Sequence, residues 1–371
     1  MTVSSANPLV RLGELGQSPW YDYITRDLVI SGELGRLIAE DGLRGMTSNP
    51  TIFEKAIAGS RLYDEEIRVQ TDAGRSPQEI FEHLAVADVR AACDLFAPVF
   101  RASDGADGLV SLEVAPTLAH DTEATVAEAE RLWRTLDRPN AMIKIPGTVE
   151  GLPAITRCIA AGISVNVTLL FSVERYGEVI EAFLAGLERR RDAGDALRPV
   201  TSVASFFVSR VDGKVDPALD RLGDPDRLRG RIAIANAAAA YRLFEWSLGT
   251  PRWQALAKAG ARPQRPLWAS TSTKDPRYSD VHYVEALVAP RTVNTLPPET
   301  FAAYRDHGRP AVRIVDEIKA APGLLEALAA RGIDLAAITR ELEADGVAKF
   351  AASYASLLAG IEAKAGALVG R

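Results

Sequence analysis

The chain has 371 residues, of which 47% are hydrophobic and 25% are charged, the balance of an ordinary globular protein. A net charge of −6 without a long basic run argues against binding to nucleic acid or to an anionic membrane surface. Two cysteines in helical patterns, four scattered histidines and no glycine-rich phosphate-binding motif predict no disulfide, no metal and no cofactor. Without a signal peptide or a membrane-spanning stretch, a cytoplasmic protein is expected.

Short apolar or β-branched runs alternate with long helical patterns along the whole chain. The runs that predict strands are residues 19–24, 43–49, 109–114, 141–146, 164–170, 201–207, 267–272 and 292–297. Between them, apolar residues recur at helical spacing, most clearly in residues 76–100, 121–136, 173–194 and 227–248. Ser76 before Pro77, and Asp121 before Thr122 and Glu123, are typical of helix N-termini.

Eight strands, each followed by a helix, favour a closed parallel (β/α)₈ (TIM) barrel over an open doubly wound sheet. Residues 1–371 are therefore expected to form a single barrel domain. Residues 299–371 exceed what one closing helix needs, and their pattern predicts about four further helical pieces that decorate the barrel.

Polar residues stand in or near the ends of these strands, and in such a barrel the active site lies at the carboxyl ends of the strands. Burying a polar group without a partner costs a few kcal/mol, so packing alone does not explain the whole set. These residues are Asp22, Asn49, Glu113, Lys144, Thr168, Ser205, Arg210, Ser270 and Lys274.

Lys144 stands inside an apolar run, AMIKIPG at residues 141–147. A lysine there can extend from an edge strand to solvent or act as a gatekeeper against aggregation. However, the chain has only eight lysines among 43 basic residues, and arginine supplies most of its positive charge. Unlike guanidinium, an amine can lose its proton and become a nucleophile, which favours a chemical role for Lys144.

One chemistry follows if these groups surround one cavity. The pKa of a lysine amine must fall from about 10.4 to near 7, which burial can achieve. Lys144 then forms a Schiff base with a ketone, and the protonated imine permits retro-aldol cleavage. Asp22 is the candidate base for a sugar hydroxyl, and Glu113 with Thr168 can hold the water that takes part in imine formation. Arg210 and Lys274 are candidates to bind a phosphate.

Several motifs resemble those of transaldolases, in the order and spacing of that family from about residue 18 to 297. They are GMTSNPTIF (45–53), LEVAPTLAHDTEATVAEAERLW (112–133), AMIKIPGTVEGLPAI (141–155), ISVNVTLLFSVERY (163–176) and SFFVSRVDGKVD (205–216). The chain resembles the long bacterial form of about 370 residues. Residues 268–297 also resemble the transaldolase half of transaldolase–glucose-6-phosphate isomerase fusions.

The resemblance implies a barrel of the class I aldolase type and a role for each matching residue. Lys144 is the Schiff-base lysine, Asp22 the acid/base in carbon–carbon cleavage, and Glu113 and Thr168 position the catalytic water. The residues implied to surround the sugar and its phosphate are Asn49, Asn166, Ser205, Phe207 and Arg210. Many members have an arginine after the alanine-serine of strand seven, where this chain has ASTSTK, which leaves the role of Lys274 open. Asp27 lies close to Asp22 in the sequence, so which of the two matches the acid/base residue of the family is also left open.

The resemblance further implies a transferase of the pentose phosphate pathway, with sugar phosphates as substrates. It would move a dihydroxyacetone unit from sedoheptulose 7-phosphate or fructose 6-phosphate to glyceraldehyde 3-phosphate or erythrose 4-phosphate, without cofactor or metal. The alternatives are a class I aldolase acting on fructose 6-phosphate and a catalytically silent binding protein. The expected assembly is a monomer or homodimer.

Overall fold

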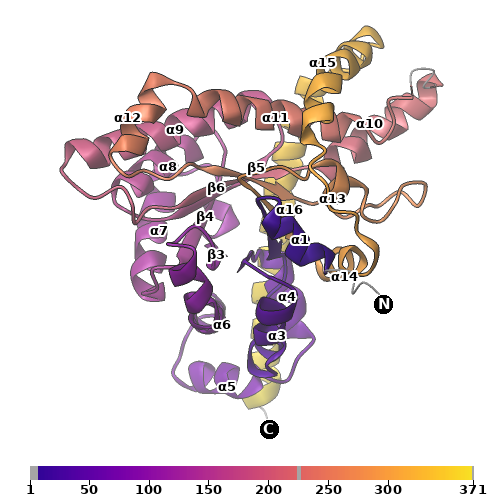
Figure 1. Ribbon diagram of the computed structural model, residues 1–371. Helices are drawn as coiled ribbons and strands as arrows, with labels where there is room; N and C mark the ends of the chain where they lie inside the picture. The colour runs from indigo at the N-terminus through magenta and orange to yellow at the C-terminus, as the bar shows by residue number, and fades with distance from the viewer. Residues whose placement is uncertain (1–6, 224–226, 370–371) are drawn as a thin grey trace, which may run out of the picture.

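The computed structural model describes residues 7–223 and 227–369, and its centre is a closed barrel of parallel strands in chain order (Figure 1). Every neighbouring pair is parallel, and β8 closes the barrel against β1. The strands are β1 Gln17–Tyr21, β2 Gly45–Met46, β3 Leu109–Glu113, β4 Ala141–Pro146, β5 Val165–Leu170, β6 Ser202–Phe207, β7 Arg265–Ala269 and β8 Thr292–Leu296. All eight predicted strands and the predicted (β/α)₈ fold are confirmed.

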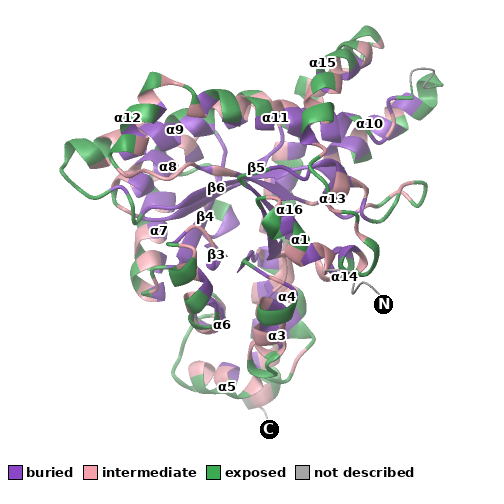
Figure 2. Ribbon diagram, viewed as in Figure 1, coloured by how far each residue is buried: buried purple, intermediate pink, exposed green. Residues whose placement is uncertain are grey.

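Helices surround the barrel and bury its outer surface, so that the strands are buried on both faces (Figure 2). Those up to β5 are α1 Pro8–Glu14, α2 Arg26–Ile30, α3 Glu33–Glu40, α4 Pro50–Ala58, α5 Asp64–Asp72, α6 Pro77–Ala102, the 3₁₀ turn η1 Pro116–Leu118, α7 Thr122–Leu136 and α8 Gly151–Ala160. After β5 come α9 Val173–Asp192, α10 Ser209–Leu222, α11 Ile232–Leu248, α12 Pro251–Lys258, α13 His282–Ala286, α14 Pro298–His307, α15 Ile314–Ala330 and α16 Leu335–Val369.

Two predicted helix starts are confirmed by their caps. The Ser76 side chain accepts a hydrogen bond from the Glu79 amide, and Glu79 returns one to the Ser76 amide, so that α6 begins with a capping box. At α7 the Asp121 carboxylate accepts from the Ala124 amide. Local sequence alone fixes these two helix starts.

The strand boundaries differ slightly from the prediction where the apolar pattern is short. β1 ends at Tyr21 instead of residue 24, so Asp22 lies immediately after the strand. β7 spans Arg265–Ala269 instead of 267–272, which places Ser270 and Lys274 in the loop that follows. These shifts move the polar residues from the ends of the strands into the loops at the barrel mouth.

The C-terminal region corrects one expectation: its described residues form three helices, not four. The last of them, α16, runs unbroken for 35 residues. Gly346 lies within it although a mid-helix glycine costs about 1 kcal/mol relative to alanine. A Cβ at this position would stand 3.0 Å from the Leu169 side chain, so glycine lets α16 pass close to the end of β5.

α16 packs along α4 and α5 and also contacts α6 and α10 (Figure 1). Thr51 of α4 donates to Ser353, and Lys364 donates to the Ile57 carbonyl. No helix in the described part of the chain is long and apolar enough to cross a membrane.

Candidate active site

The carboxyl ends of the strands surround a cavity of about 1310 Å³, here called the mouth. Its wall includes all the predicted site residues except Glu113 and Asn166. The predicted residues in this wall are Asp22, Asn49, Lys144, Thr168, Ser205, Phe207, Arg210, Ser270 and Lys274. A parallel barrel brings its strand ends to one face, which is why residues far apart in the sequence meet here.

Lys144 is buried in the mouth, with only 4% of its surface exposed. In the barrel register it stands between Glu113 of β3 and Asn166 of β5. Its Nζ lies 3.1 Å from Glu113 Oε2 and donates a hydrogen bond of 3.0 Å to the Ser48 carbonyl. Since an isolated buried charge is strongly unfavourable, these contacts stabilise the amine where it faces the mouth.

Glu113 is buried, and Lys144 is its charged partner among the described residues. Burial raises the pKa of its carboxyl, and the nearby Lys144 amine opposes that rise. The carboxylate forms a close ion pair with the Lys144 amine at 3.1 Å, and no other described side chain or amide donates to its oxygens. A buried carboxyl whose pKa is raised, next to an amine, is suited to exchange a proton with that amine.

Thr168 is buried in the wall of the mouth, and no described residue hydrogen-bonds to its Oγ1. The backbone is irregular at this point: the β5–β6 register shifts between Val167 and Leu170, and Leu169 has a φ of +60°. A bulge of this kind redirects side chains and is common beside active sites. Here it accompanies the residue expected to hold the catalytic water.

Asn166 lies below the mouth and is fully engaged with its neighbours. Its Nδ2 donates to Ser111 Oγ at 3.0 Å, and its Oδ1 accepts from Ser205 Oγ at 2.7 Å. All three side chains are buried. In this structure Asn166 therefore orients Ser205, which itself lines the mouth.

Asp22 enters the mouth from the loop after β1. Its Oδ1 accepts from Thr47 Oγ1 at 2.7 Å, and Thr47 also contacts Thr295 Oγ1 at 2.6 Å. The carboxyl is partly open to the cavity but surrounded by protein, and this burial raises its pKa, against the effect of Lys144. Asp27, the alternative candidate for the acid/base residue, is exposed on α2 and does not line the mouth.

Arg210 is the strongest candidate anion ligand. Its guanidinium carbon lies 5.0 Å from the centre of the Phe207 ring, a cation–π contact. Burial lowers its pKa, and the charge of Asp22 partly offsets this. No hydrogen bond or ion pair joins the guanidinium to another residue that the structure describes, so its five N–H donors are available to a ligand.

Ser270 and Lys274 complete this side of the mouth from the β7 loop. Ser270 has a φ of +55°, and its hydroxyl lies 3.1 Å from that of Ser209. Lys274 is exposed, and no described acidic group pairs with it. Asn49 lines the opposite side, with its Oδ1 capping α4 through the Ile52 amide.

The sequence did not predict the contribution of α16. Leu342, Lys349, Phe350 and Ser353 of this helix line the mouth, and the Phe350 ring centre lies 5.6 Å from Lys144 Nζ. α4 adds Lys55. Because about 200 residues separate Phe350 from Lys144, no local pattern signals this contact. Within residues 7–223 and 227–369, no group of histidine, cysteine and acidic side chains could hold a metal.

The fold and site define a class of (β/α)₈ barrel enzymes with a buried, carboxylate-paired lysine in the mouth. A family profile described as "Transaldolase/Fructose-6-phosphate aldolase" matches residues 19–361. The curated "Transaldolase" of Acidothermus cellulolyticus is 53% identical over 96% of each chain, and that of Frankia alni is 50% identical over 97% of this chain and 98% of the relative. The "Transaldolase" of Thermobifida fusca is 51% identical over 95% of this chain and 96% of its own. The chain belongs to the transaldolase family.

Proposed function

We propose that the protein transfers a dihydroxyacetone unit from a ketose phosphate to an aldose phosphate through a Schiff base on Lys144. The donors are sedoheptulose 7-phosphate and fructose 6-phosphate, and the acceptors are glyceraldehyde 3-phosphate and erythrose 4-phosphate, as in the pentose phosphate pathway. The observation that supports this most is the buried Lys144 amine in the mouth, 3.1 Å from the Glu113 carboxylate.

The first half of the reaction forms the imine. Glu113 accepts a proton from Lys144, and the neutral Nζ then attacks the C2 carbonyl of the donor to give a carbinolamine. The C2 hydroxyl then leaves as water, taking a proton from the Glu113 carboxyl, so that an iminium ion and the Glu113 carboxylate remain. Thr168 Oγ1, which has no partner among the described residues, is available to that water.

The second half breaks and remakes a carbon–carbon bond. Asp22 accepts the proton of the C4 hydroxyl while the C3–C4 electron pair moves into the iminium, which releases an aldose phosphate and leaves an enamine on Lys144. The enamine then attacks the acceptor aldehyde, and the steps run in reverse. The phosphate is held by Arg210, whose guanidinium lies free over Phe207, with Lys274 at the rim.

A fructose-6-phosphate aldolase is the second candidate, because the family profile names both activities. An aldolase protonates the enamine and releases dihydroxyacetone, whereas a transferase keeps the enamine until an acceptor arrives. The glutamate at position 113 and the relatives named transaldolase at about half identity favour the transferase.

Reductive trapping tests the chemistry. The protein is incubated with fructose 6-phosphate, reduced with borohydride and mapped by mass spectrometry, and a three-carbon adduct on Lys144 is expected. Product formation is then compared with and without an aldose phosphate. Strict acceptor dependence is expected, and release of dihydroxyacetone without acceptor would assign the aldolase activity instead. A wild-type protein that forms no adduct with any ketose phosphate would instead support a binding role.

A further inference from the structure

Lys144 lines a large mouth and is nevertheless almost completely covered. Only 4% of its surface is exposed, although the mouth of about 1310 Å³ has room for tens of water molecules at about 30 Å³ each. Contacts with Glu113 Oε2 and with the Ser48 carbonyl account for part of this cover. A further neighbour is the Phe350 ring of α16, whose centre lies 5.6 Å from Nζ. An apolar ring therefore stands beside the nucleophile in the wall of the mouth.

Phe350 is held in this position by the helix on either side of it. One turn before it, Gly346 lets α16 pass close to Leu169 of β5, where a Cβ would stand 3.0 Å from the leucine side chain. Three residues after it, Ser353 accepts a hydrogen bond of 2.8 Å from Thr51 of α4. Phe350 itself is buried, with 4% of its surface exposed. The ring is therefore a fixed part of the wall.

The proposed function requires cover beside Lys144. After the C3–C4 bond of the donor breaks, the enamine on Lys144 has two fates. Addition of a proton at C3 and of water at C2 releases dihydroxyacetone and returns the Lys144 ammonium, which is the aldolase outcome. Attack of C3 on an aldehyde keeps the three carbons for transfer. Because the mouth has room for far more than three carbons, the bound fragment does not by itself displace the water around C3.

Phe350 lies where it supplies that cover. The carbon that bonds to Nζ lies about 1.5 Å from it, so the fragment begins beside a ring whose centre is 5.6 Å from the same atom. An apolar ring in contact with the fragment takes the place of water on that side, and such contact is favourable because it removes apolar surface from water. The local environment of the enamine therefore depends on this side chain more than on the size of the mouth.

We propose that Phe350 is a specificity-determining residue, whose ring keeps water from the enamine carbon on Lys144 and so favours transfer over release of dihydroxyacetone. The inference rests on the proposed function and deepens it. It assigns the choice between the two activities that the family profile names to a residue of α16. On this proposal α16 takes part in the reaction as well as packing against the barrel.

The partition of the enamine measures this role. The full-length protein is given fructose 6-phosphate with a fixed concentration of erythrose 4-phosphate in D₂O. Mass spectrometry quantifies sedoheptulose 7-phosphate, the product of transfer, and dihydroxyacetone with one carbon-bound deuterium, the product of protonation by solvent. Both products come from the same enamine, so their initial ratio does not depend on the rate of imine formation. Release without acceptor then shows which branch has changed.

Phe350→Ala is expected to raise the ratio of dihydroxyacetone to transfer product at least tenfold, through faster release. Phe350→Leu keeps an apolar side chain beside the fragment and should remain within threefold of the wild type. Phe350→Gln has a side chain of similar length that binds water, and it should raise the ratio at least fivefold. Leu357→Ala is the matched control, because it removes a buried side chain of α16 that does not line the mouth, and it should leave the ratio unchanged.

Three results would overturn the proposal. The first is an unchanged ratio in folded Phe350→Ala and Phe350→Gln, and the glutamine variant keeps the test decisive if the alanine variant does not fold. The second is a rise in Phe350→Leu as large as in Phe350→Gln. The third is an equal rise in Leu357→Ala, which would trace the effect to a loosened helix. Failure of the proposed function looks different, because the wild-type protein would then form no trapped imine or no transfer product.

Discussion

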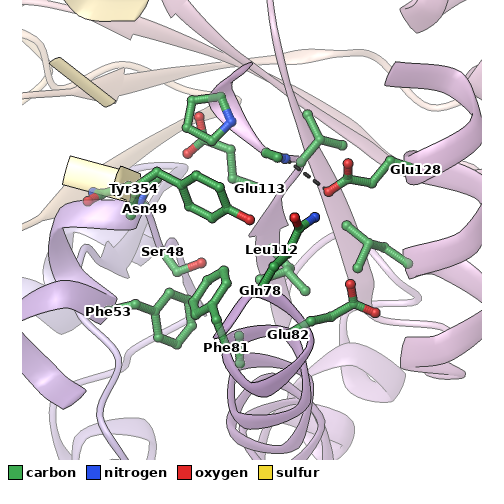
Figure 3. A pocket seen from close by; sticks show the side chains of 16 residues that line it. Ser48, Asn49, Phe53, Gln78, Phe81, Glu82, Leu112, Glu113, Glu128 and Tyr354 are labelled. Atoms are coloured by element: carbon green, nitrogen blue, oxygen red, sulfur yellow. Dashed lines mark hydrogen bonds between the residues drawn. The ribbon is translucent and has the colours of Figure 1, made fainter. Parts of the chain in front are cut away.

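Lys144 Nζ lies 3.1 Å from Glu113 Oε2, and this ion pair is buried at the mouth of the barrel. The charge of the lysine partly offsets the rise in pKa that burial gives the Glu113 carboxyl. Lys144 lines the mouth, whereas Glu113 is one of the residues around a second, smaller cavity of about 30 Å³ beside it (Figure 3). The ion pair therefore lies between the two cavities.

Glu113→Gln should slow imine formation. The amide cannot donate a carboxyl proton to the departing hydroxyl, and loss of a general acid or base typically costs about 10²–10⁴-fold in rate. We expect kcat to fall by that factor with KM within about threefold of wild type. Rapid mixing followed by borohydride trapping measures the step directly. An unchanged rate of imine formation would remove Glu113 from the proton transfer.

Lys144→Met should abolish transfer and make stability depend on pH. Without the lysine charge, burial raises the pKa of Glu113 further than in the wild type. A carboxyl with a raised folded pKa contributes stability below its unfolded pKa near 4.3, and this contribution is lost as pH rises through the folded value. Relative to wild type, the variant should be about 3 kcal/mol less stable at pH 7 and close to it near pH 4.

Urea unfolding from pH 4 to 8 measures this effect, with the double variant Lys144→Met, Glu113→Gln as the control. The double variant has no carboxyl at this position, so its stability should not show the additional loss at high pH. If the single and double variants have parallel pH profiles, Glu113 is not the group that responds.

The strand-end residues could be predicted from sequence because one rule connects them. In a closed parallel barrel each strand delivers its last residues to the same face, so local patterns around Lys144, Thr168 and Ser205 were enough to bring them into one mouth. The same rule placed Arg210 after the sixth strand, where it lines the mouth.

Features that depend on long-range packing carried no such signal. Phe350 reaches Lys144 only because α16 continues unbroken past the end of β5, and Gly346, which permits that approach, resembles a helix break in the sequence. The left-handed Leu169 is similar, because leucine has no local preference for a positive φ and the surrounding barrel must impose it. Glu128 is an ordinary helical glutamate until the fold places it in the wall of the smaller cavity.

Arg210→Ala should weaken binding of phosphorylated substrates more than Lys274→Ala does. The guanidinium is partly buried with its donors free, and a hydrogen bond to a charged group contributes about 1.5–3 kcal/mol, or about 10–100-fold in KM. Lys274 is exposed, where a charge pair contributes at most about 1 kcal/mol. The measurement is KM for fructose 6-phosphate, with unphosphorylated fructose as the comparison substrate.

Arg221→Ala, an exposed change on the same helix, is the matched control and should leave KM unaltered. If Arg210→Ala weakened fructose and fructose 6-phosphate equally, the guanidinium would not be a phosphate ligand. An equal rise in KM for fructose 6-phosphate in the Arg210 and Lys274 variants would instead indicate that the two side chains contribute equally to phosphate binding.

Asp212, two residues after Arg210, should make the wall of the mouth sensitive to pH. Burial, reinforced by the charge of Asp216, raises its pKa to about 7, although the Ala233 amide and the Tyr283 hydroxyl both donate to it. Because the folded pKa is raised, the contribution of Asp212 to stability is complete below the unfolded value near 3.9 and is lost as pH rises through 7, an effect of up to about 4 kcal/mol.

Asp212→Asn carries no titrating group at this position. The thermal midpoint of the wild type should therefore fall relative to that of the variant between pH 5 and pH 8. Since Asp212 holds α11 and α13 against α10, the wild-type KM for phosphorylated substrate should rise over the same range, while the variant should show a flatter profile. Parallel midpoints for the two proteins across this range would show that Asp212 does not titrate there.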